Sequence, residues 1–422
     1  MRIAIYEPRG SGHRFAYVGR LIPALAELAA EFNLAGGLTL ITSREAIETA
    51  AYRMHVAPYA DVLRVETLSI SATPGKAGQR ARVDALFEAV ETFRPDHLYV
   101  PYGDPLILGV SLRTRTTRRA TGRRFPETEV IVMRGKYAYP GGGLRGRWQG
   151  HVAKRALLAG PWSRVHHLDP YAVRRLGGDP ENPAGRVRLL PDPIEAPAAM
   201  TKADARRLLG VPVEPRYVGL IGGVDARKGG DLLIKTFARA AERDAGLRLL
   251  LAGKIEHPAV RSLLEQEHAG LVSGGRIIAL DRRLTEEEFT AAAQALDVVV
   301  TAYPDHLHSA SVVTTAAAAG RPVVAFRHGW MGRTVEQFGL GATSPPGDLD
   351  ALCQAVLRCA ATADQHEPSE AARRYVRFQS VANFQAHATD RLREKLGAKP
   401  SPDLAPWGWV TAPGDGAEGD QI

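Results

Sequence analysis

Short apolar runs alternate with amphipathic stretches along the first half of the chain. Residues 3–5 and 38–41 are apolar runs, and between them residues 21–32 place apolar side chains at helical spacing. Apolar runs of this length predict buried strands, and the helical spacing predicts a helix between them. Further runs predict strands at 97–100, 129–133, 164–168 and 186–190. Strands separated by helices indicate parallel pairing, so we expect a doubly wound α/β sheet.

A second alternating series follows a short linker. Residues 194–200 are rich in alanine and proline, which is typical of a semi-rigid linker, and Thr201 is a good cap for a helix over residues 202–209. The pattern then predicts strands at 217–221, 247–251, 276–280, 297–301 and 322–326, with helices at 230–243, 258–267, 285–295, 309–319 and 349–360. We therefore expect two Rossmann-like domains, over residues 1–195 and 201–365.

Length and composition agree with a two-domain globular protein. The 422 residues exceed the usual size of one hydrophobic core, and 45% of them are hydrophobic. No apolar run is long enough to span a bilayer, and Met1 leads directly into a strand pattern rather than a signal peptide. The two cysteines, Cys353 and Cys359, have no ligand set beside them, so we expect neither a disulfide nor a zinc site and a cytoplasmic location.

The excess of positive charge is concentrated in one segment. The formal net charge is +8, and six arginines lie between Arg113 and Arg124. Such a run suits an anionic membrane surface or an anionic acceptor, but a solvated helix face is an equally open interpretation. Because no aromatic residues interleave with the arginines, we do not expect nucleic acid as a partner.

The most specific motif lies between residues 218 and 231. It reads Val-Gly-Leu-Ile-Gly-Gly-Val-Asp-Ala-Arg-Lys-Gly-Gly-Asp, a strand that ends in a glycine turn and presents Lys228. About ninety residues later, residues 316–326 read Ala-Ala-Ala-Ala-Gly-Arg-Pro-Val-Val-Ala-Phe, and Pro-Pro-Gly-Asp follows at 345–348. In this order the motifs resemble the nucleotide-sugar half of GT-B glycosyltransferases, in particular the retaining family four, glycosyl transferases group 1.

The resemblance implies a donor site in the second domain that faces an acceptor site in the first across a cleft. It places Lys228 on the donor diphosphate, where a fixed cation would stabilise the leaving group. The other donor-side positions that we expect are Gly222, Gly223, Arg227, Arg282, His308, Ser309, Ser311, Thr315, Gly329 and Trp330. Trp330 is open to two interpretations, stacking on a sugar or packing. In the resembling enzymes a terminal helix, here within residues 366–396, crosses back to the first domain. Residues 397–422 we expect to be a flexible tail.

Two glutamates that are usual in the resembling family are missing. Counting back from Gly320-Arg-Pro, their positions hold Leu307 and Thr315. His306, His308 or Asp305 is available near the sugar ring, and Ser309 and Ser311 open the following helix. The missing glutamates leave open a second function, a sugar-nucleotide-binding protein or partner subunit without turnover. A third, epimerisation of the sugar, would need acid and base carboxylates that the motifs do not offer.

Acceptor-side candidates lie in the first domain. The loop after the first strand carries Gly10, Gly12 and His13, and His13 is placed to contact an acceptor hydroxyl or a phosphate. Asp104 follows another strand and either orients an acceptor hydroxyl or forms a turn, and Arg134 is a further contact. The catalytic residues predicted are therefore Lys228, His13 and Asp104. No ligand set of metal spacing occurs, so we expect no metal and no cofactor beyond the nucleotide diphosphate sugar as co-substrate.

Overall fold

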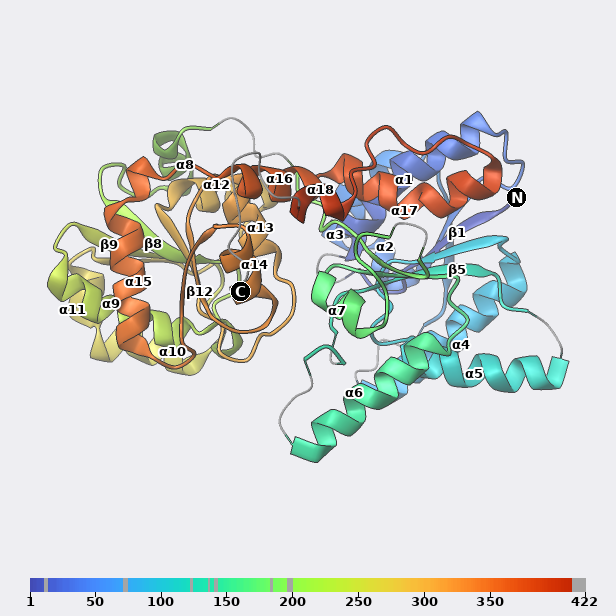
Figure 1. The fold of residues 1–422 in the computed structure, drawn as a ribbon, viewed down its shortest axis with the longest axis horizontal. Coiled ribbons are helices and arrows are strands. Elements are labelled where there is room, and N and C mark those ends of the chain that lie inside the picture. The colour runs from blue at the N-terminus through green and yellow to red at the C-terminus, as the bar shows by residue number, and fades with distance from the viewer. Residues whose placement is uncertain are drawn as a thin grey trace. The chain divides into compact units, whose positions relative to one another are not determined.

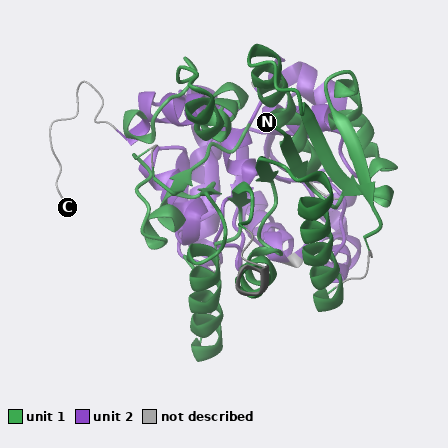
Figure 2. Cartoon of the chain, turned by 90° about the vertical axis from the view of Figure 1, so that its right-hand side faces the viewer, with its two compact units in different colours: residues 1–193, 380–409 green, residues 194–379, 410–422 purple. Residues whose placement is uncertain are grey.

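The chain forms two compact units in a computed structural model that describes residues 1–10, 14–70, 75–121, 124–135, 137–139, 143–182, 185–195 and 200–411. Unit 1 comprises residues 1–193 and 380–409, and unit 2 comprises residues 194–379 and 410–422 (Figure 2). The chain therefore leaves unit 1, builds unit 2, and returns to unit 1 near its end. Each unit contains one parallel sheet with its own helices.

The sheet of unit 1 has seven parallel strands in the order β3-β2-β1-β4-β5-β6-β7. The order reverses between β1 and β4, which is the topological switch point of a doubly wound sheet. The strands are β1 (Ile3–Tyr6), β2 (Leu38–Ser43), β3 (Arg64–Leu68), β4 (His97–Val100), β5 (Glu127–Val132), β6 (Arg164–His167) and β7 (Val187–Leu189).

Helices cover both faces of this sheet (Figure 1). They are α1 (Arg14–Glu31), α2 (Arg44–Ile47), α3 (Ala50–His55), α4 (Gly75–Phe93), α5 (Ile107–Thr121), α6 (Gly143–Leu158), α7 (Pro170–Arg175) and α17 (Val381–Leu396), with a 3₁₀ turn η1 (Ala57–Tyr59). Helices α1 and α17 lie side by side on one face (Figure 1), where the amide of Gln385 donates to the carbonyl of Arg20 over 2.8 Å.

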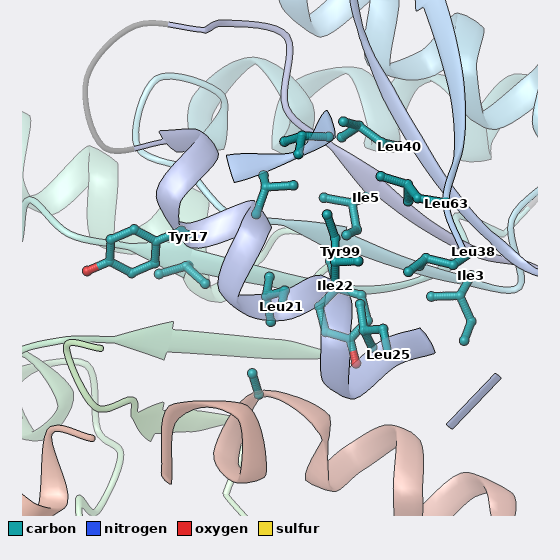
Figure 3. Packing of buried hydrophobic residues seen from close by; sticks show 14 of the residues in the cluster. Ile3, Ile5, Tyr17, Leu21, Ile22, Leu25, Leu38, Leu40, Leu63 and Tyr99 are labelled. Carbon is teal, nitrogen blue, oxygen red and sulfur yellow. The ribbon is translucent and has the colours of Figure 1, made fainter. Parts of the chain in front are cut away.

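The core of unit 1 forms where α1 packs on the sheet. Leu21, Ile22 and Leu25 of α1 lie among apolar residues of the strands, and Tyr17 of the same helix belongs to the same cluster (Figure 3). All four are buried, since the apolar side chains recur at helical spacing along one face. From the other side of α1, Phe384 of α17 completes the cluster with its ring centre 5.7 Å from that of Tyr17. Burying these side chains fixes α1, and with it the loop that precedes α1.

A buried polar group lies on three neighbouring strands of the same sheet. The Glu129 carboxylate bonds the Nε2 atoms of His97 and His166 at 2.9 and 2.6 Å. Burial alone would raise the pKa of Glu129, but the hydrogen bonds from His166 and His97 outweigh burial and lower this pKa to about 2. The group therefore keeps a paired negative charge inside unit 1.

The sheet of unit 2 has six parallel strands in the order β10-β9-β8-β11-β12-β13. The same reversal occurs here between β8 and β11. The strands are β8 (Arg216–Ile221), β9 (Leu247–Ala252), β10 (Ile277–Leu280), β11 (Val298–Thr301), β12 (Val323–Phe326) and β13 (Gly341–Ser344). The helices are α8 (Lys202–Leu209), α9 (Gly230–Arg243), α10 (Pro258–Ser262), α11 (Ala269–Ser273), α12 (Glu286–Ala295), α13 (Ser311–Ala318), α14 (Gly329–Gln337), α15 (Leu349–Ala361) and α16 (Glu370–Phe378), with short turns η2 (Ala226–Lys228), η3 (Leu263–Glu267) and η4 (Ala363–Gln365).

The predicted fold class is confirmed, since both units are doubly wound parallel α/β folds. Thr201 caps α8 as predicted, by accepting a hydrogen bond from the backbone of Asp204. Two strands, β3 and β13, were not predicted from the sequence. Neither forms an apolar run, because β3 is mostly polar and β13 begins and ends with small residues. Among the described residues, no helix is long and apolar enough to cross a membrane.

The C-terminal segment differs from its prediction in two ways. The long helix expected within residues 366–396 is broken into α16 and α17, because the Ser380 side chain accepts from the backbone of Asn383 and starts a new helix. Residues 397–411, expected to be flexible, contain helix α18 (Trp407–Thr411), and the Trp407 side chain is buried. The buried indole supplies the apolar anchor that a flexible tail would lack.

Candidate functional site

The carboxyl edge of the unit 2 sheet gathers most of the predicted donor residues. Strands β8, β11 and β12 are neighbours in the sheet, so the loops that follow them lie along one edge. In open α/β sheets ligands bind outside the carboxyl ends of the strands, at the point where the strand order reverses. That point lies between β8, which leads into the Lys228 turn, and β11, which leads into Tyr303.

Lys228 is held by the turn that precedes it. Its backbone amide donates to Asp225 Oδ1 over 2.9 Å, and its Nζ donates to the carbonyl of Ile221 over 3.2 Å. Burial first, and then the charge of Arg227, lower the pKa of Lys228 to about 8, while Asp225 acts in the opposite sense. A partly desolvated ammonium group in the turn after a strand is stabilised when an anion binds beside it, so this position favours an anionic ligand.

The glycines around this turn allow the backbone to approach closely. Gly222 has a positive φ of 86°, and a β-carbon there would lie 2.7 Å from Lys228 Nζ. Gly229, with a φ of 65°, lies so close to β11 that a β-carbon would come within 2.4 Å of the Ala302 carbonyl oxygen. Gly223 is different, since it is exposed and its nearest neighbour would be 3.9 Å away. Gly222 and Gly229 therefore shape the turn, and Gly223 does not.

Tyr303 lies beside Lys228 and was missed by sequence reasoning. Its ring centre is 5.8 Å from Lys228 Nζ, and its side chain is buried. Burial raises the pKa of its hydroxyl well above the usual range. An aromatic residue that directly follows a buried strand was the available signal. The uncharged Tyr303 ring therefore packs beside the Lys228 ammonium group.

The loop after β11 meets the Lys228 turn at Arg227. The Arg227 guanidinium lies 3.4 Å from His306 Nδ1, and the Nε2 of His306 lies 3.2 Å from the carbonyl oxygen of Ser309. The rings of His306 and His308 meet edge to face at 5.9 Å. The loop that holds Leu307 at the position of a family glutamate therefore places His306 beside Arg227, and His308 packs against His306.

The helix that follows this loop begins at Ser311, with Ala310 as its cap residue. Ser309 consequently lies before the helix, and Thr315 is half-buried within it. The first amides of a helix can donate to an anion, and the contact predicted for the Ser309 and Ser311 region stays a prediction. The ribose contact predicted for Thr315 stays a prediction.

Trp330 is a packing residue rather than a platform for a sugar. Its side chain is 2% exposed, and its backbone amide donates to the Leu307 carbonyl over 2.9 Å. Gly329, with a φ of 63°, permits this contact, since a β-carbon there would lie 2.7 Å from the Leu307 α-carbon. The stacking interpretation is therefore wrong, because the buried indole offers no face to a ligand. Its role is to hold the β11 loop against α14.

Arg282 is separated from the Lys228 turn. It follows β10, which is separated from β8 by β9. Its guanidinium pairs with Glu288 over 2.6 Å, and the same carboxylate belongs to the capping box of α12. The Arg282 guanidinium is therefore paired within its own loop and helix. Its predicted contact with the nucleotide sugar has no geometric support and stays a prediction.

The Asp104 carboxylate in unit 1 is hydrogen-bonded to backbone amides. Its two carboxylate oxygens accept hydrogen bonds from the amides of Met133 and Arg134, over 2.9 and 2.8 Å. These bonds tie the loop after β4 to the loop after β5, which favours the turn-forming interpretation over a catalytic one. The Arg134 side chain is exposed beside this junction and stays a predicted contact.

The first loop of unit 1 is only partly within the described residues. Gly12 and His13 lie outside them, so the roles predicted for both stay predictions. Gly10 packs against Thr49, because a β-carbon there would lie 2.6 Å from the threonine hydroxyl. Sequence reasoning missed Glu7 at the end of β1, a buried carboxyl group whose pKa burial raises to about 8. An ionisable residue that directly follows an apolar strand was the signal.

The basic segment has mixed roles. Arg113 pairs with Asp84 and stacks on Phe87 with its Cζ atom 4.6 Å from the ring centre, so it joins α5 to α4. Arg115 is exposed. In the part of the chain that the structure describes, no group of three or more His, Cys, Asp or Glu side chains is arranged to hold a metal ion.

Comparison with known proteins first defines the class of fold. Sucrose-phosphate synthase from Thermosynechococcus elongatus superposes with a TM-score of 0.68 at 20% identity, covering 94% of this chain and 100% of that one. Alr3699/HepE from Anabaena, in complex with UDP, superposes with a TM-score of 0.66 at 15% identity, covering 93% and 100%. The chain therefore has the GT-B fold, as predicted.

The second comparison concerns the sequence of unit 2. Residues 215–362 match the family described as "Glycosyl transferases group 1". The chain is similar to the D-inositol 3-phosphate glycosyltransferase of Corynebacterium urealyticum, with 29% identity over 184 residues. That alignment spans 40% of this chain and 42% of the relative. The family match over residues 215–362 includes the Lys228 turn and the loops after β11 and β12, where most of the predicted donor residues lie.

Proposed function

We propose that this protein is a glycosyltransferase that moves a sugar from a nucleotide diphosphate sugar to an acceptor bound by unit 1, with retention of configuration. The observation that carries the proposal is the half-buried Lys228, whose Nζ donates to the Ile221 carbonyl at the carboxyl end of β8, inside the segment that matches glycosyl transferases group 1. The structural neighbour HepE was solved in complex with UDP, which supports a nucleotide as a ligand of this chain.

The chemistry proposed for this chain is mainly electrostatic. As the bond between sugar and phosphate breaks, the leaving diphosphate gains negative charge, and the Lys228 ammonium stabilises it. Arg227 lies next to Lys228 with an exposed guanidinium and adds a second charge. The amides at the start of α13 supply hydrogen-bond donors. In this proposal the leaving phosphate itself accepts the acceptor proton, so the chain needs no carboxylate at Leu307 or Thr315.

A second function, donor binding without turnover, is favoured by one observation. Leu307 and Thr315 stand where the resembling family has glutamates, and neither side chain can act as an acid or a base. Both functions require a nucleotide sugar at the Lys228 turn. They differ in whether nucleoside diphosphate is released when an acceptor is present.

The test is release of nucleoside diphosphate from UDP-, GDP- and dTDP-sugars, first alone and then with cell extract as acceptor source. Slow release that Lys228→Ala abolishes would support transfer and identify the donor. Lys235→Ala is the matched control, because this lysine is exposed on α9, the helix that follows the turn. Tight donor binding by calorimetry without release under any condition would support the binding function. Neither binding nor release would overturn both.

We also propose that helix α6 brings unit 1 to an anionic membrane surface. Two large apolar side chains, Leu144 and Trp148, are 85% and 67% exposed, and their spacing of four residues places them on one face of α6. Arg145 and Arg147 are exposed between them. Apolar side chains flanked by arginines are typical of helices that lie at the boundary of lipid headgroups and acyl chains. The anionic lipid surface matches the positive charge of this segment. A cytoplasmic location stays a prediction.

A further inference from the structure

Two loops at the carboxyl edge of the unit 1 sheet converge on one group of charged residues. Arg14 is the first residue of α1, and its Cζ atom lies 4.2 Å from the ring centre of Tyr102, which follows β4. Because the strand order reverses between β1 and β4, this contact lies at the switch point of the sheet. Open α/β sheets bind their ligands in the crevice at such a point.

A single buried carboxyl group, Glu7, lies near enough to three arginines to respond to their charges. Burial raises its pKa, while the charges of Arg14, Arg9 and Arg82 act in the opposite sense. Glu7 is 2% exposed, and one of its oxygens accepts a hydrogen bond from the Arg9 amide over 3.1 Å. The Nε of Arg14 lies 3.9 Å from the same oxygen. The other oxygen, Oε2, is buried without a hydrogen bond among the described residues. Positive charge is therefore in excess here, since one carboxyl group responds to the charges of three arginines.

The third arginine, Arg82, is buried within α4. Arg82 is 6% exposed. Its backbone carbonyl accepts a hydrogen bond from the Tyr6 hydroxyl over 2.6 Å, and this bond holds α4 beside β1. Within the described part of the chain, its Nε has no hydrogen-bond partner and its guanidinium makes no ion pair. Burial and the charges of Arg9 and Arg14 lower the pKa of Arg82, while Tyr6 and Glu7 raise it, so these groups are close enough to act on one another.

A buried guanidinium without a partner is costly, because it loses water and gains nothing in return. Such a group is explained when a ligand supplies the missing acceptor oxygens. A guanidinium donates two parallel hydrogen bonds to the oxygens of a phosphate or a carboxylate. Because three guanidinium groups outnumber one carboxyl group, the excess charge matches a dianion better than a monoanion.

We propose that Arg9, Arg14 and Arg82 bind a phosphate monoester on the acceptor. The assignment of this group to the acceptor rests on the proposed function, in which unit 1 holds the acceptor. Arg82 supplies the buried charge, and Arg14, held by stacking on Tyr102, closes the site from the first turn of α1.

Calorimetric titration of the full-length protein with inorganic phosphate tests the site. Replacing Arg82 by Met should weaken phosphate binding about tenfold or more, since a charge-assisted hydrogen bond is lost. Arg80→Met is the matched control, because Arg80 is exposed on the same helix, and it should leave the affinity unchanged. Equal affinities of wild type and Arg82→Met would overturn the proposal. Binding that survives Arg82→Met but disappears in Lys228→Ala would assign the phosphate to unit 2 and overturn it as well.

Two further measurements keep the result interpretable. Thermal unfolding shows whether Arg82→Met folds; if it does not, Arg82→Lys keeps a point charge and should retain part of the phosphate affinity. The titration does not depend on turnover. If no nucleoside diphosphate is released, the transferase function is contradicted, but the phosphate titration still tests the arginine site. With an active donor, Arg82→Met should raise the KM of sugar phosphates as acceptors and not that of the corresponding free sugars. Equal effects on both would show that the phosphate is not what Arg82 binds.

Discussion

The Nζ atom of Lys228 lies 2.7 Å from the position that a β-carbon would take at Gly222. The glycine has a φ of 86° and ends β8, so the strand turns sharply and leaves room for the folded-back lysine. Only glycine combines this backbone conformation with the absence of a side chain. The glycine and the lysine therefore act as one unit, in which the first residue creates the space that the second occupies.

Replacing Gly222 by Ala should displace Lys228. The positive φ costs about 1 kcal/mol or more for alanine, and the methyl group pushes the ammonium out of its position. We expect nucleoside diphosphate affinity to fall about tenfold or more, measured by calorimetry. Gly210→Ala is the control, because Gly210 also has a positive φ, 70°, and a β-carbon there would meet nothing within 4 Å. Equal effects of the two substitutions would contradict the role of Gly222.

The lowered pKa of Lys228 predicts a pH dependence of donor binding. In the free protein this pKa is about 8, so the lysine is charged below that pH and loses its proton above it. A bound diphosphate stabilises the charged form and raises the pKa, so binding takes up a proton in this range. We expect the affinity for nucleoside diphosphate to fall as the pH rises above 8, approaching about tenfold per pH unit. Lys228→Arg should move this decline to higher pH, and a decline that persists unchanged in Lys228→Ala would contradict the assignment.

Glu129 and Glu127, two residues apart on β5, should differ strongly in their contribution to stability. Glu129 is 1% exposed and bonds two histidines, whereas Glu127 pairs with Arg391 and Lys395 near the surface. Breaking a buried charge pair costs about 3–5 kcal/mol, and a surface pair is worth about 1 kcal/mol or less. Chemical denaturation should therefore show a large loss for Glu129→Gln and a small one for Glu127→Gln. Similar losses for both would rule out a special role for the buried group.

The same pair predicts the response to acid. The pKa of Glu129 is about 2 in the folded protein, below the ordinary value of 4.5, so the folded state holds this proton less tightly than the unfolded state. Its stabilisation is complete above pH 4.5 and is lost as the pH falls from 4.5 towards 2. Glu129→Gln should remove this part of the pH dependence of the free energy of unfolding. An unchanged acid profile in the variant would contradict the assignment.

The sequence predicted the fold well because apolar strands and capped helices are local signals. The strand and turn at residues 216–228 and the Thr201 cap are examples, since each is specified by neighbouring residues. The polar strand β3 was not predicted, because its place in the sheet depends on pairing with β2, which is distant in sequence. The break between α16 and α17 was missed for a different reason, since a single Ser cap outweighs a continuous helical pattern.

The candidate site was predicted only in part, because contacts between loops cannot be read from one loop. Lys228 and its glycines form one local motif, and the structure brings them together with Arg227. Trp330 and Asp104 were assigned to ligands from their positions after strands, but their side chains are used by packing and by backbone amides. Arg82 was overlooked altogether, because in sequence a helical arginine resembles any other solvated charge.

The exposed apolar side chains of α6 predict binding to anionic vesicles. Trp148→Ser removes an indole that the membrane would bury, and the loss of this apolar area should weaken binding about tenfold. Co-sedimentation with vesicles of phosphatidylcholine and phosphatidylglycerol measures the effect, and added salt should weaken the wild type further, because arginines contribute through Coulomb attraction.

Leu208→Ser is the matched control for this experiment. Leu208 is 42% exposed on α8 of unit 2, outside the proposed surface, so its replacement should leave vesicle binding unchanged. If Arg145 and Arg147 provide the attraction and Trp148 the insertion, neutral vesicles should bind weakly and be insensitive to salt. Equal binding of neutral and anionic vesicles would contradict the electrostatic part. No binding to either would show that the exposed indole serves another purpose, because an interfacial helix must partition into at least one of these surfaces.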